Sequence, residues 1–211
     1  MAAKNLFIIG AGGFAKEAYL IYKSSKVYIN NFKFIGFIDN NELGRVVIDG
    51  YKVIGDDNFL KDKKNIHLVI GIGNLEIRKN IFNRFNRVDV KFPNFIHQSV
   101  NADWENIRIG KGNIISSLVS MDTHIKIGDF NCINKNCTIG HDVSIADFCQ
   151  INPGSNISGF VQIENNCLLG SGSNIYNGMK LSSNTVIGMG ASLFSCTKAN
   201  STYVGNPAKK I

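Results

Sequence analysis

The 211-residue chain has little proline and tryptophan, few cysteines, and no long apolar run. Three prolines against 21 glycines argue against a proline-rich linker and indicate many tight turns within regular structure. No apolar run approaches the roughly 20 residues of a membrane helix, and the first one, Leu6–Ile9, is too short for a signal peptide. The five cysteines form no Cys-x-x-Cys pair, so reduced core residues are expected rather than disulfides or a zinc site. The sequence therefore predicts a cytoplasmic protein that neither crosses a membrane nor holds a metal.

Charge is spread unevenly along the chain. The formal net charge is +7, and residues 1–100 hold 15 Lys and Arg against 9 Asp and Glu, whereas residues 101–211 hold 8 against 7. A basic N-terminal half favours an anionic partner. The lysines are scattered and no nucleic-acid-binding motif accompanies them, so no nucleic acid partner is expected. Small phosphorylated ligands fit the charge equally well.

Apolar residues recur at every sixth position through the C-terminal half. Fifteen consecutive positions, from Ile109 to Leu193, are apolar, and small or β-branched residues mostly stand two positions earlier. Six is not a multiple of the helical period, so each hexad is interpreted as one short strand and a bend. Three hexads would close an 18-residue coil whose strands pair in parallel with those of the next coil. Glycine, frequent just after the apolar residue, is expected to meet the unusual backbone torsion of the bend.

The first 95 residues have a different pattern, in which strands and helices alternate. Predicted elements are a strand at Asn5–Ile9, a helix through Tyr22, strands at Phe34–Asp39 and His67–Gly73, and a helix at Glu76–Phe85. Such alternation favours a small parallel α/β sheet. Pro93 interrupts an apolar run before the hexads begin, so the predicted domains are residues 1–95 and 96–211.

The loop after the first strand fits the dinucleotide-binding pattern, with Gly10, Gly12 and Ala15 in its three small positions. Asp39 follows at the tip of the next strand, where an acid could bind a ribose hydroxyl. About 95 residues make only one mononucleotide half of a full Rossmann fold, which suits a single nucleoside diphosphate. An NAD-binding module remains an alternative.

Motifs in both halves carry a family resemblance. The motifs are Gly10-Ala11-Gly12-Gly13-Phe14-Ala15-Lys16, Phe37-Ile38-Asp39-Asn40, Gly71-Ile72-Gly73-Asn74-Leu75-Glu76-Ile77-Arg78 and the hexads. Over essentially its whole length the chain resembles bacterial sugar O- and N-acetyltransferases, which include sialic acid O-acetyltransferases and N-acetyltransferases of nucleotide-linked 4-amino-dideoxy sugars. The resemblance implies a Rossmann-like N-terminal domain followed by a left-handed parallel β-helix. It also implies acetyl-CoA as co-substrate, a homotrimer with coenzyme A between neighbouring chains, and a part in surface glycan synthesis.

The resemblance also assigns binding residues. It implies that Gly12, Gly13 and Phe14 lie near the phosphates of a nucleotide sugar, that Asp39 and Asn40 lie near its base or ribose, and that Asn74 belongs to the same site. For acetyl-CoA it implies Gly159, Gly188, Gly190, Lys209 and Gln150. Gln150 stands where many relatives carry a second histidine.

His141 is the candidate catalytic base. Acetyl transfer from a thioester needs a group that accepts a proton near neutral pH, and the family's catalytic histidine lies in the Ile-Gly-His-acid motif found at residues 139–142. Asp142 is expected to hold the imidazole tautomer. His124 lies almost one coil earlier and is an expected neighbour. The predicted activity is N-acetylation of the 4-amino group; O-acetylation of sialic acid or a related sugar, and a non-catalytic nucleotide-sugar-binding scaffold, remain alternatives.

Overall fold

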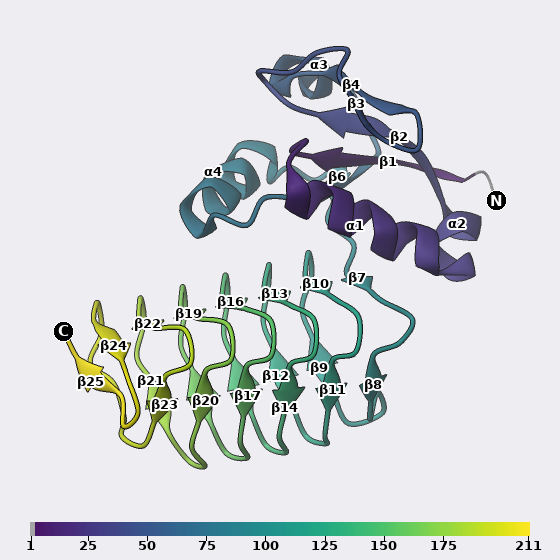
Figure 1. Cartoon of the computed structure of the whole chain (residues 1–211). Helices are drawn as coiled ribbons and strands as arrows, with labels where there is room; N and C mark the ends of the chain where they lie inside the picture. The colour runs from purple at the N-terminus through teal and green to yellow at the C-terminus, as the bar shows by residue number, and fades with distance from the viewer. Residues whose placement is uncertain (1–2) are drawn as a thin grey trace. The chain divides into compact units, whose positions relative to one another are not determined.

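The computed structural model describes residues 3–211 and divides into two compact units, Met1–Gln98 and Ser99–Ile211 (Figure 1). Each unit has its own buried apolar residues. No helix among residues 3–211 combines the length and the apolar character needed to cross a membrane.

A six-stranded sheet forms the centre of the N-terminal unit, in the order β3-β4-β2-β1-β5-β6. The strands are β1 Lys4–Ile9, β2 Phe32–Ile38, β3 Val46–Ile48, β4 Tyr51–Gly55, β5 Ile66–Ile70 and β6 Val90–Lys91. The helices are α1 Gly13–Ser24, α2 Lys26–Asn31, α3 Asp57–Lys61 and α4 Leu75–Phe85, and a short strand β7, Phe95–Ile96, follows. The predicted strands and helices are present, although β5 ends three residues before the predicted Gly73.

The sheet is mixed rather than wholly parallel, which corrects the prediction. Strand β3 pairs antiparallel with β4, while the other pairs run parallel. Asp49 and Gly50 connect β3 to β4 with φ values of 48° and 78°. Two successive residues with positive φ match the right-handed twist of the strands, so Asp-Gly is a favoured hairpin turn.

The strand order reverses next to β1. Strand β2 lies on one side of β1 and β5 on the other, both in parallel. In such sheets ligands bind beyond the carboxyl ends of the strands at this point. The helix after β1 packs closely there: a Cβ on Gly71 would lie 2.7 Å from Cα of the buried Ala15. The small residues at both positions therefore let α1 approach the end of β5.

The C-terminal unit is a parallel β-helix of the left-handed type, built from two-residue strands stacked coil upon coil (Figure 1). The strands are β8 Asn101–Ala102, β9 Arg108–Ile109, β10 Ile114–Ile115, β11 Ser120–Met121, β12 Lys126–Ile127, β13 Cys132–Ile133, β14 Thr138–Ile139, β15 Ser144–Ile145, β16 Gln150–Ile151, β17 Asn156–Ile157, β18 Gln162–Ile163, β19 Leu168–Leu169, β20 Asn174–Ile175, β21 Lys180–Leu181, β22 Val186–Ile187, β23 Ser192–Leu193, β24 Thr202–Val204 and β25 Lys209–Lys210. They form three walls: the first contains β10, β13, β16, β19, β22, β24 and β25, the second β8, β11, β14, β17, β20 and β23, and the third β9, β12, β15, β18 and β21.

Coil spacing and side-chain direction follow the hexad prediction. Ile133 pairs with Ile151, 18 residues later, and the same offset recurs on all three walls. Of the fifteen apolar positions, all but the partly exposed Ile109 are buried. The small residues two positions earlier are buried as well, Cys149 and Cys167 among them. Large aliphatic side chains therefore fill the interior while small ones fit near the corners.

The residues that adopt the left-handed torsion of the corners are not the predicted glycines directly after the apolar residues. Positive φ occurs at the third residue after each inward apolar position, at fourteen consecutive corners from Gly112 to Gly190. The glycines that directly follow the apolar residue are needed for space instead: a Cβ on Gly170, for example, would lie 2.5 Å from the backbone nitrogen of Met189.

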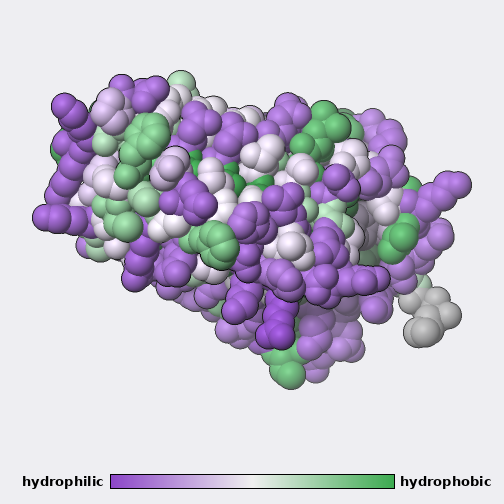
Figure 2. Space-filling view, turned by 90° about the horizontal axis from the view of Figure 1, so that it is seen from below, coloured by the Kyte–Doolittle hydropathy of each residue, from purple (hydrophilic) through white to green (hydrophobic). Residues whose placement is uncertain are grey.

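Figure 2 shows one face of the molecule, on which hydrophobic residues form small separate groups among hydrophilic ones.

Candidate functional site

His141 lies at a corner of the β-helix, between β14 and β15. Asp142 takes the left-handed torsion of this corner, φ 58°, and its N–H donates to the carbonyl of Thr123 in the preceding coil at 3.1 Å. The imidazole Nδ1 lies 2.9 Å from Oδ2 of Asp142, and the two side chains are 47% and 41% exposed. The two adjacent side chains thus meet rather than point apart, and no hydrogen bond to Nε2 occurs within residues 3–211.

The next coil lies against the imidazole ring. Gly159 passes beside Cε1 and Nε2, and the ring of Phe160 stands edge-to-face with that of His141, with centroids 4.9 Å apart. Gly159 therefore contacts the candidate base, and its predicted contact with acetyl-CoA stays a prediction.

A shallow hollow opens beside His141 and has an acidic lining. It is lined by Asn101, Ala102, Asp103, Met121, Asp122, Thr123 and His141. Hydrogen bonds from Thr123 and Asn106 hold the pKa of Asp103 below its ordinary value, so this carboxyl is ionised at neutral pH. A second hollow shares Asp122 and continues over the hydroxyl and amide groups of Ser120, Thr138, Asn156 and Ser158. The arrangement brings the imidazole of His141, carboxylates and neutral hydrogen-bonding groups to one region of the β-helix.

His124 lies near this hollow, as expected. It occupies the corner 18 residues before Asp142, has φ 57°, and contributes to lowering the pKa of Asp103. The sequence analysis missed Asp103, Asp122 and Thr123. The 18-residue period could have identified two of them. It places residues 122 and 123 in the preceding coil, at the positions equivalent to residues 140 and 141.

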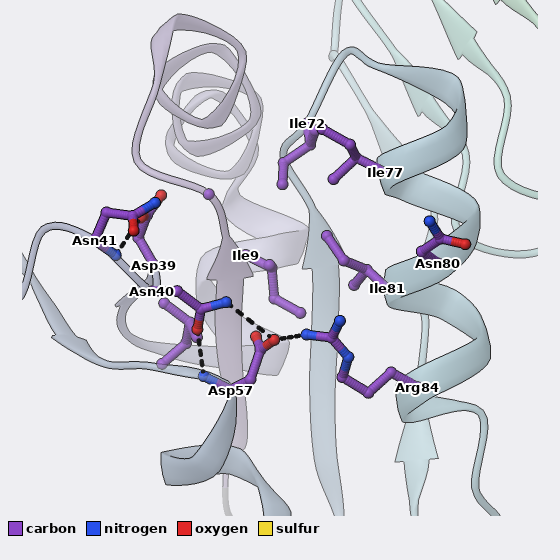
Figure 3. A pocket seen from close by; sticks show the side chains of 12 residues that line it. Ile9, Asp39, Asn40, Asn41, Asp57, Ile72, Ile77, Asn80, Ile81 and Arg84 are labelled. Carbon is purple, nitrogen blue, oxygen red and sulfur yellow. Dashed lines mark hydrogen bonds and ion pairs between the residues drawn. The ribbon is translucent and has the colours of Figure 1, made fainter.

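The N-terminal unit has a pocket of about 340 Å³ at the end of its central strands, where the strand order reverses (Figure 3). Asn40 donates to Asp57 at 3.2 Å and accepts from its N–H at 3.0 Å, and Arg84 forms an ion pair with the same carboxylate. Asp39 accepts from the N–H of Asn41 at 3.0 Å. The remaining lining residues are Ile9, Gly10, Ile38, Ile72, Ile77, Asn80 and Ile81. A polar edge thus faces an apolar one, as a site for a base and ribose requires.

Two of the predicted substrate residues, Asp39 and Asn40, line this pocket. Gly12, Gly13 and Phe14 do not line it; they form the start of α1, whose N-terminus has no side-chain cap. A Cβ on Gly12 or Gly13 would meet nothing within 4 Å, and the N–H groups of Gly13 and Phe14 have no backbone acceptor within residues 3–211, so the start of α1 is uncrowded. The oxygen of Asn74 accepts from the N–H of Ile77 at 3.0 Å and caps α4.

The other predicted acetyl-CoA residues lie apart from His141 in the fold. Gln150 is buried on β16, on the first wall, and donates to Asn152 at 3.0 Å. His141 lies between the second and third walls. Gly188 packs against Val204, Gly190 is a corner residue with φ 65°, and Lys209 lies exposed on β25. Residues 3–211 contain no group of three or more His, Cys, Asp or Glu side chains placed to bind a metal.

Comparison with known proteins identifies relatives of both units. Residues 5–85 match the family model of the PglD N-terminal domain. No curated protein matches the chain by sequence. The acetyltransferase domain of PglB from Neisseria gonorrhoeae, solved with acetyl coenzyme A, is 25% identical, with a TM-score of 0.91 over 100% of both chains.

Two further solved structures have the same fold. One is the H141N variant of perosamine N-acetyltransferase from Caulobacter crescentus, in complex with CoA and GDP-perosamine, at 24% identity and a TM-score of 0.90 over 100% of this chain and 98% of that one. The other is WeeI from Acinetobacter baumannii, at 24% identity and a TM-score of 0.87 over 99% and 100%. These matches confirm the two-part fold and the resemblance to bacterial sugar acetyltransferases.

Proposed function

Because residues 5–85 are a PglD N-terminal domain and a β-helix follows it, we propose that the protein transfers an acetyl group from acetyl-CoA to the amine of a nucleotide-linked amino sugar. The observation that carries this proposal is the imidazole of His141, with Nδ1 on Asp142 and Nε2 free, at the edge of an acidic hollow. We place the reaction in the cytoplasm, where acetyl-CoA and nucleotide sugars are made, and in surface glycan synthesis.

His141 acts as the general base in the proposed mechanism. The sugar nitrogen attacks the thioester carbonyl carbon while Nε2 takes a proton from the nitrogen. The tetrahedral oxyanion needs a hydrogen-bond donor, and the N–H of Gly159, beside the imidazole, has no acceptor within residues 3–211. The carbon–sulfur bond then breaks, and the sulfur of coenzyme A leaves with the proton from Nε2. No acyl-enzyme is part of this mechanism, because none of the cysteines lines the two hollows near His141, and burial raises the pKa of the Cys137 thiol to about 11.

The lining of the hollow favours an amine over a hydroxyl as acceptor. Asp103 and Asp122 attract the cationic form of an amine and do not attract a neutral hydroxyl. The bound ammonium group releases one proton to water, and the neutral nitrogen then attacks the thioester. Asp122→Asn is expected to raise the KM for the amino sugar several-fold and to leave the KM for acetyl-CoA unchanged. An equal rise in both constants would contradict a role for Asp122 in acceptor selection.

The N-terminal unit binds the nucleotide in this proposal. Asp39 and Asn40 contact the base or ribose, and the first amides of α1, at Gly13 and Phe14, contact the phosphates. Gly13→Val adds bulk only to open space, so it should abolish the calorimetric heat of nucleoside diphosphate binding without destabilising the fold. Equal binding by both proteins, or none by either, would contradict the assignment.

We also propose a homotrimer. Flat walls allow three copies to pack around one axis. Gln150 and His141 lie on different parts of the same β-helix, so a site that uses both requires a second chain. Sedimentation should give three times the 23.2 kDa of one chain. A fully active monomer would refute this arrangement.

The central experiment measures thiol release from acetyl-CoA with a panel of amino and hydroxy nucleotide sugars. Release is expected with amino sugars, and His141→Ala should lower kcat by about 10²–10⁴-fold while acetyl-CoA binding persists. Release only with hydroxy sugars would favour O-acetylation, no release would favour a binding scaffold, and wild-type kcat in His141→Ala would remove His141 as the base.

A further inference from the structure

The lack of a side chain at Gly159 makes room for the imidazole of His141 rather than for a neighbouring backbone segment. An ideal Cβ at this position would lie 2.7 Å from both Cε1 and Nε2 of His141 and 3.2 Å from its Cδ2. These three nearest atoms all belong to the imidazole. At Gly170, in contrast, the nearest atoms belong to the backbone of the next coil. Alanine at position 159 would therefore displace the imidazole and leave the coil intact, since the φ of Gly159 is not in the left-handed region.

Phe160 is a corner residue of the following coil, and its ring lies against that of His141. Its φ is 59°, a conformation that bulky residues rarely adopt, and its side chain is 54% exposed. Phe130 and Phe148 share this torsion at another corner, but their rings stack on each other at 5.2 Å and Phe130 is buried. The ring of Phe160 contacts His141 instead, with an interplanar angle of 88°, and its N–H donates to the His141 carbonyl at 3.0 Å. All fourteen corners from Gly112 to Gly190 share this torsion, so the stacked coils account for it, and what distinguishes Phe160 is the contact of its ring with the candidate base.

We infer that Gly159 and Phe160 are positioning residues that fix the imidazole of His141 from the following coil. This inference rests on the proposed role of His141 as the base. Asp142 hydrogen-bonds to Nδ1 of His141. Gly159 leaves room for the ring beside Nε2, and the ring of Phe160 packs edge-to-face against the imidazole. The ring is thereby held in one orientation, with Nε2 available to the acceptor.

Gly159→Ala tests the space beside the ring. The expected result is a fall in kcat of about 10- to 100-fold, because a displacement of about 1 Å in a catalytic group has an effect of this size. The KM for both substrates and the Tm should stay close to wild type, because the clash involves only the exposed imidazole. In the His141→Ala background the same substitution should change the residual rate less than twofold, because the added methyl group acts through the ring and alanine keeps the N–H of residue 159.

Phe160→Asn tests the aromatic contact. Asparagine accepts the left-handed torsion, so the Tm should not fall, whereas kcat should fall about fivefold or more. Leu118→Asn is the matched control, because Leu118 has the same φ of 59° and is 63% exposed at a different corner. It should leave kcat unchanged. Wild-type kcat in both Gly159→Ala and Phe160→Asn, or full additivity with His141→Ala, would overturn the inference.

NMR separates this inference from the proposed function. The aromatic ring of Phe160 shifts the Cε1–H resonance of His141, and Phe160→Leu should remove that shift while the resonance of His124 stays in place. If His141→Ala kept wild-type kcat but Phe160→Leu moved the resonance of His141, the proposed role of His141 as the base would fail and the contact would stand. An unmoved resonance would overturn the contact itself.

Discussion

Replacing Asp142 by asparagine separates the charge of this residue from its geometry. Its carboxylate lies 2.9 Å from Nδ1 of His141, so it keeps a proton on Nδ1 and leaves Nε2 to accept one. Asparagine can still accept from Nδ1–H and tolerates the φ of 58°, but it lacks the negative charge. Both side chains are more than 40% exposed, so the charge contributes at most about 1 kcal/mol, or about fivefold in rate. We therefore expect a fivefold lower kcat and an unchanged Tm.

Steady-state thiol release at saturating acetyl-CoA and acceptor measures this effect. Asp142→Ala is the matched comparison: it removes the acceptor atom as well, so kcat should fall further, and the left-handed torsion should cost about 1 kcal/mol of stability. Two results would refute the reasoning. A wild-type kcat in Asp142→Asn would mean that the charge has no role, and a kcat as low as that of His141→Ala would mean that solvent screening does not weaken the pair.

Three further predictions concern the rest of the chain. Arg84→Gln removes the ion-pair partner of Asp57 in the proposed nucleotide pocket and should weaken nucleoside diphosphate binding about tenfold by calorimetry, whereas Lys79→Gln, elsewhere on α4, should not. Burial lowers the pKa of His67 below its ordinary 6.5, so the unfolded chain binds the proton more readily than the folded chain. As the pH falls from about 7.5 to about 5.5, the Tm of the wild type should therefore fall more than the Tm of His67→Leu. Equal falls would contradict this prediction. Ile151→Ala opens a cavity in the β-helix and should cost about 2–4 kcal/mol in denaturant unfolding, more than the same change at the partly exposed Ile109.

The β-helix was predictable because each hexad carries its own signal. Every inward residue from Ile115 to Leu193 is fixed by the six-residue period and by local sterics, and no long-range pairing has to be guessed. The corner torsion was not predictable from glycine alone, because residues as different as Leu118, His124 and Phe130 adopt it. Stacking on the adjacent coils determines the torsion there, and local propensity does not.

The missed elements of the N-terminal unit are short and partly exposed. Asp49-Gly50 was a hairpin signal between two apolar runs, and Asp56 was a helix cap before α3. Three of the residues that line the pocket, Ile77, Ile81 and Arg84, are spaced so that they lie on one face of α4. This part of the lining could therefore have been predicted from the sequence. The pairing of Arg84 with Asp57 could not, because it depends on how separate elements pack in the unit.

The 18-residue period means that this enzyme can change length in whole coils. Removing residues 151–168 would join equivalent positions, and every remaining strand from β8 to β24 would keep a parallel partner in the same register. The same deletion would bring Asn177 and Gly178 to the places of Gly159 and Phe160, beside His141. Insertions and deletions of one coil are therefore compatible with the fold of the β-helix. Next to His141, however, such a change replaces the residues that surround the candidate base.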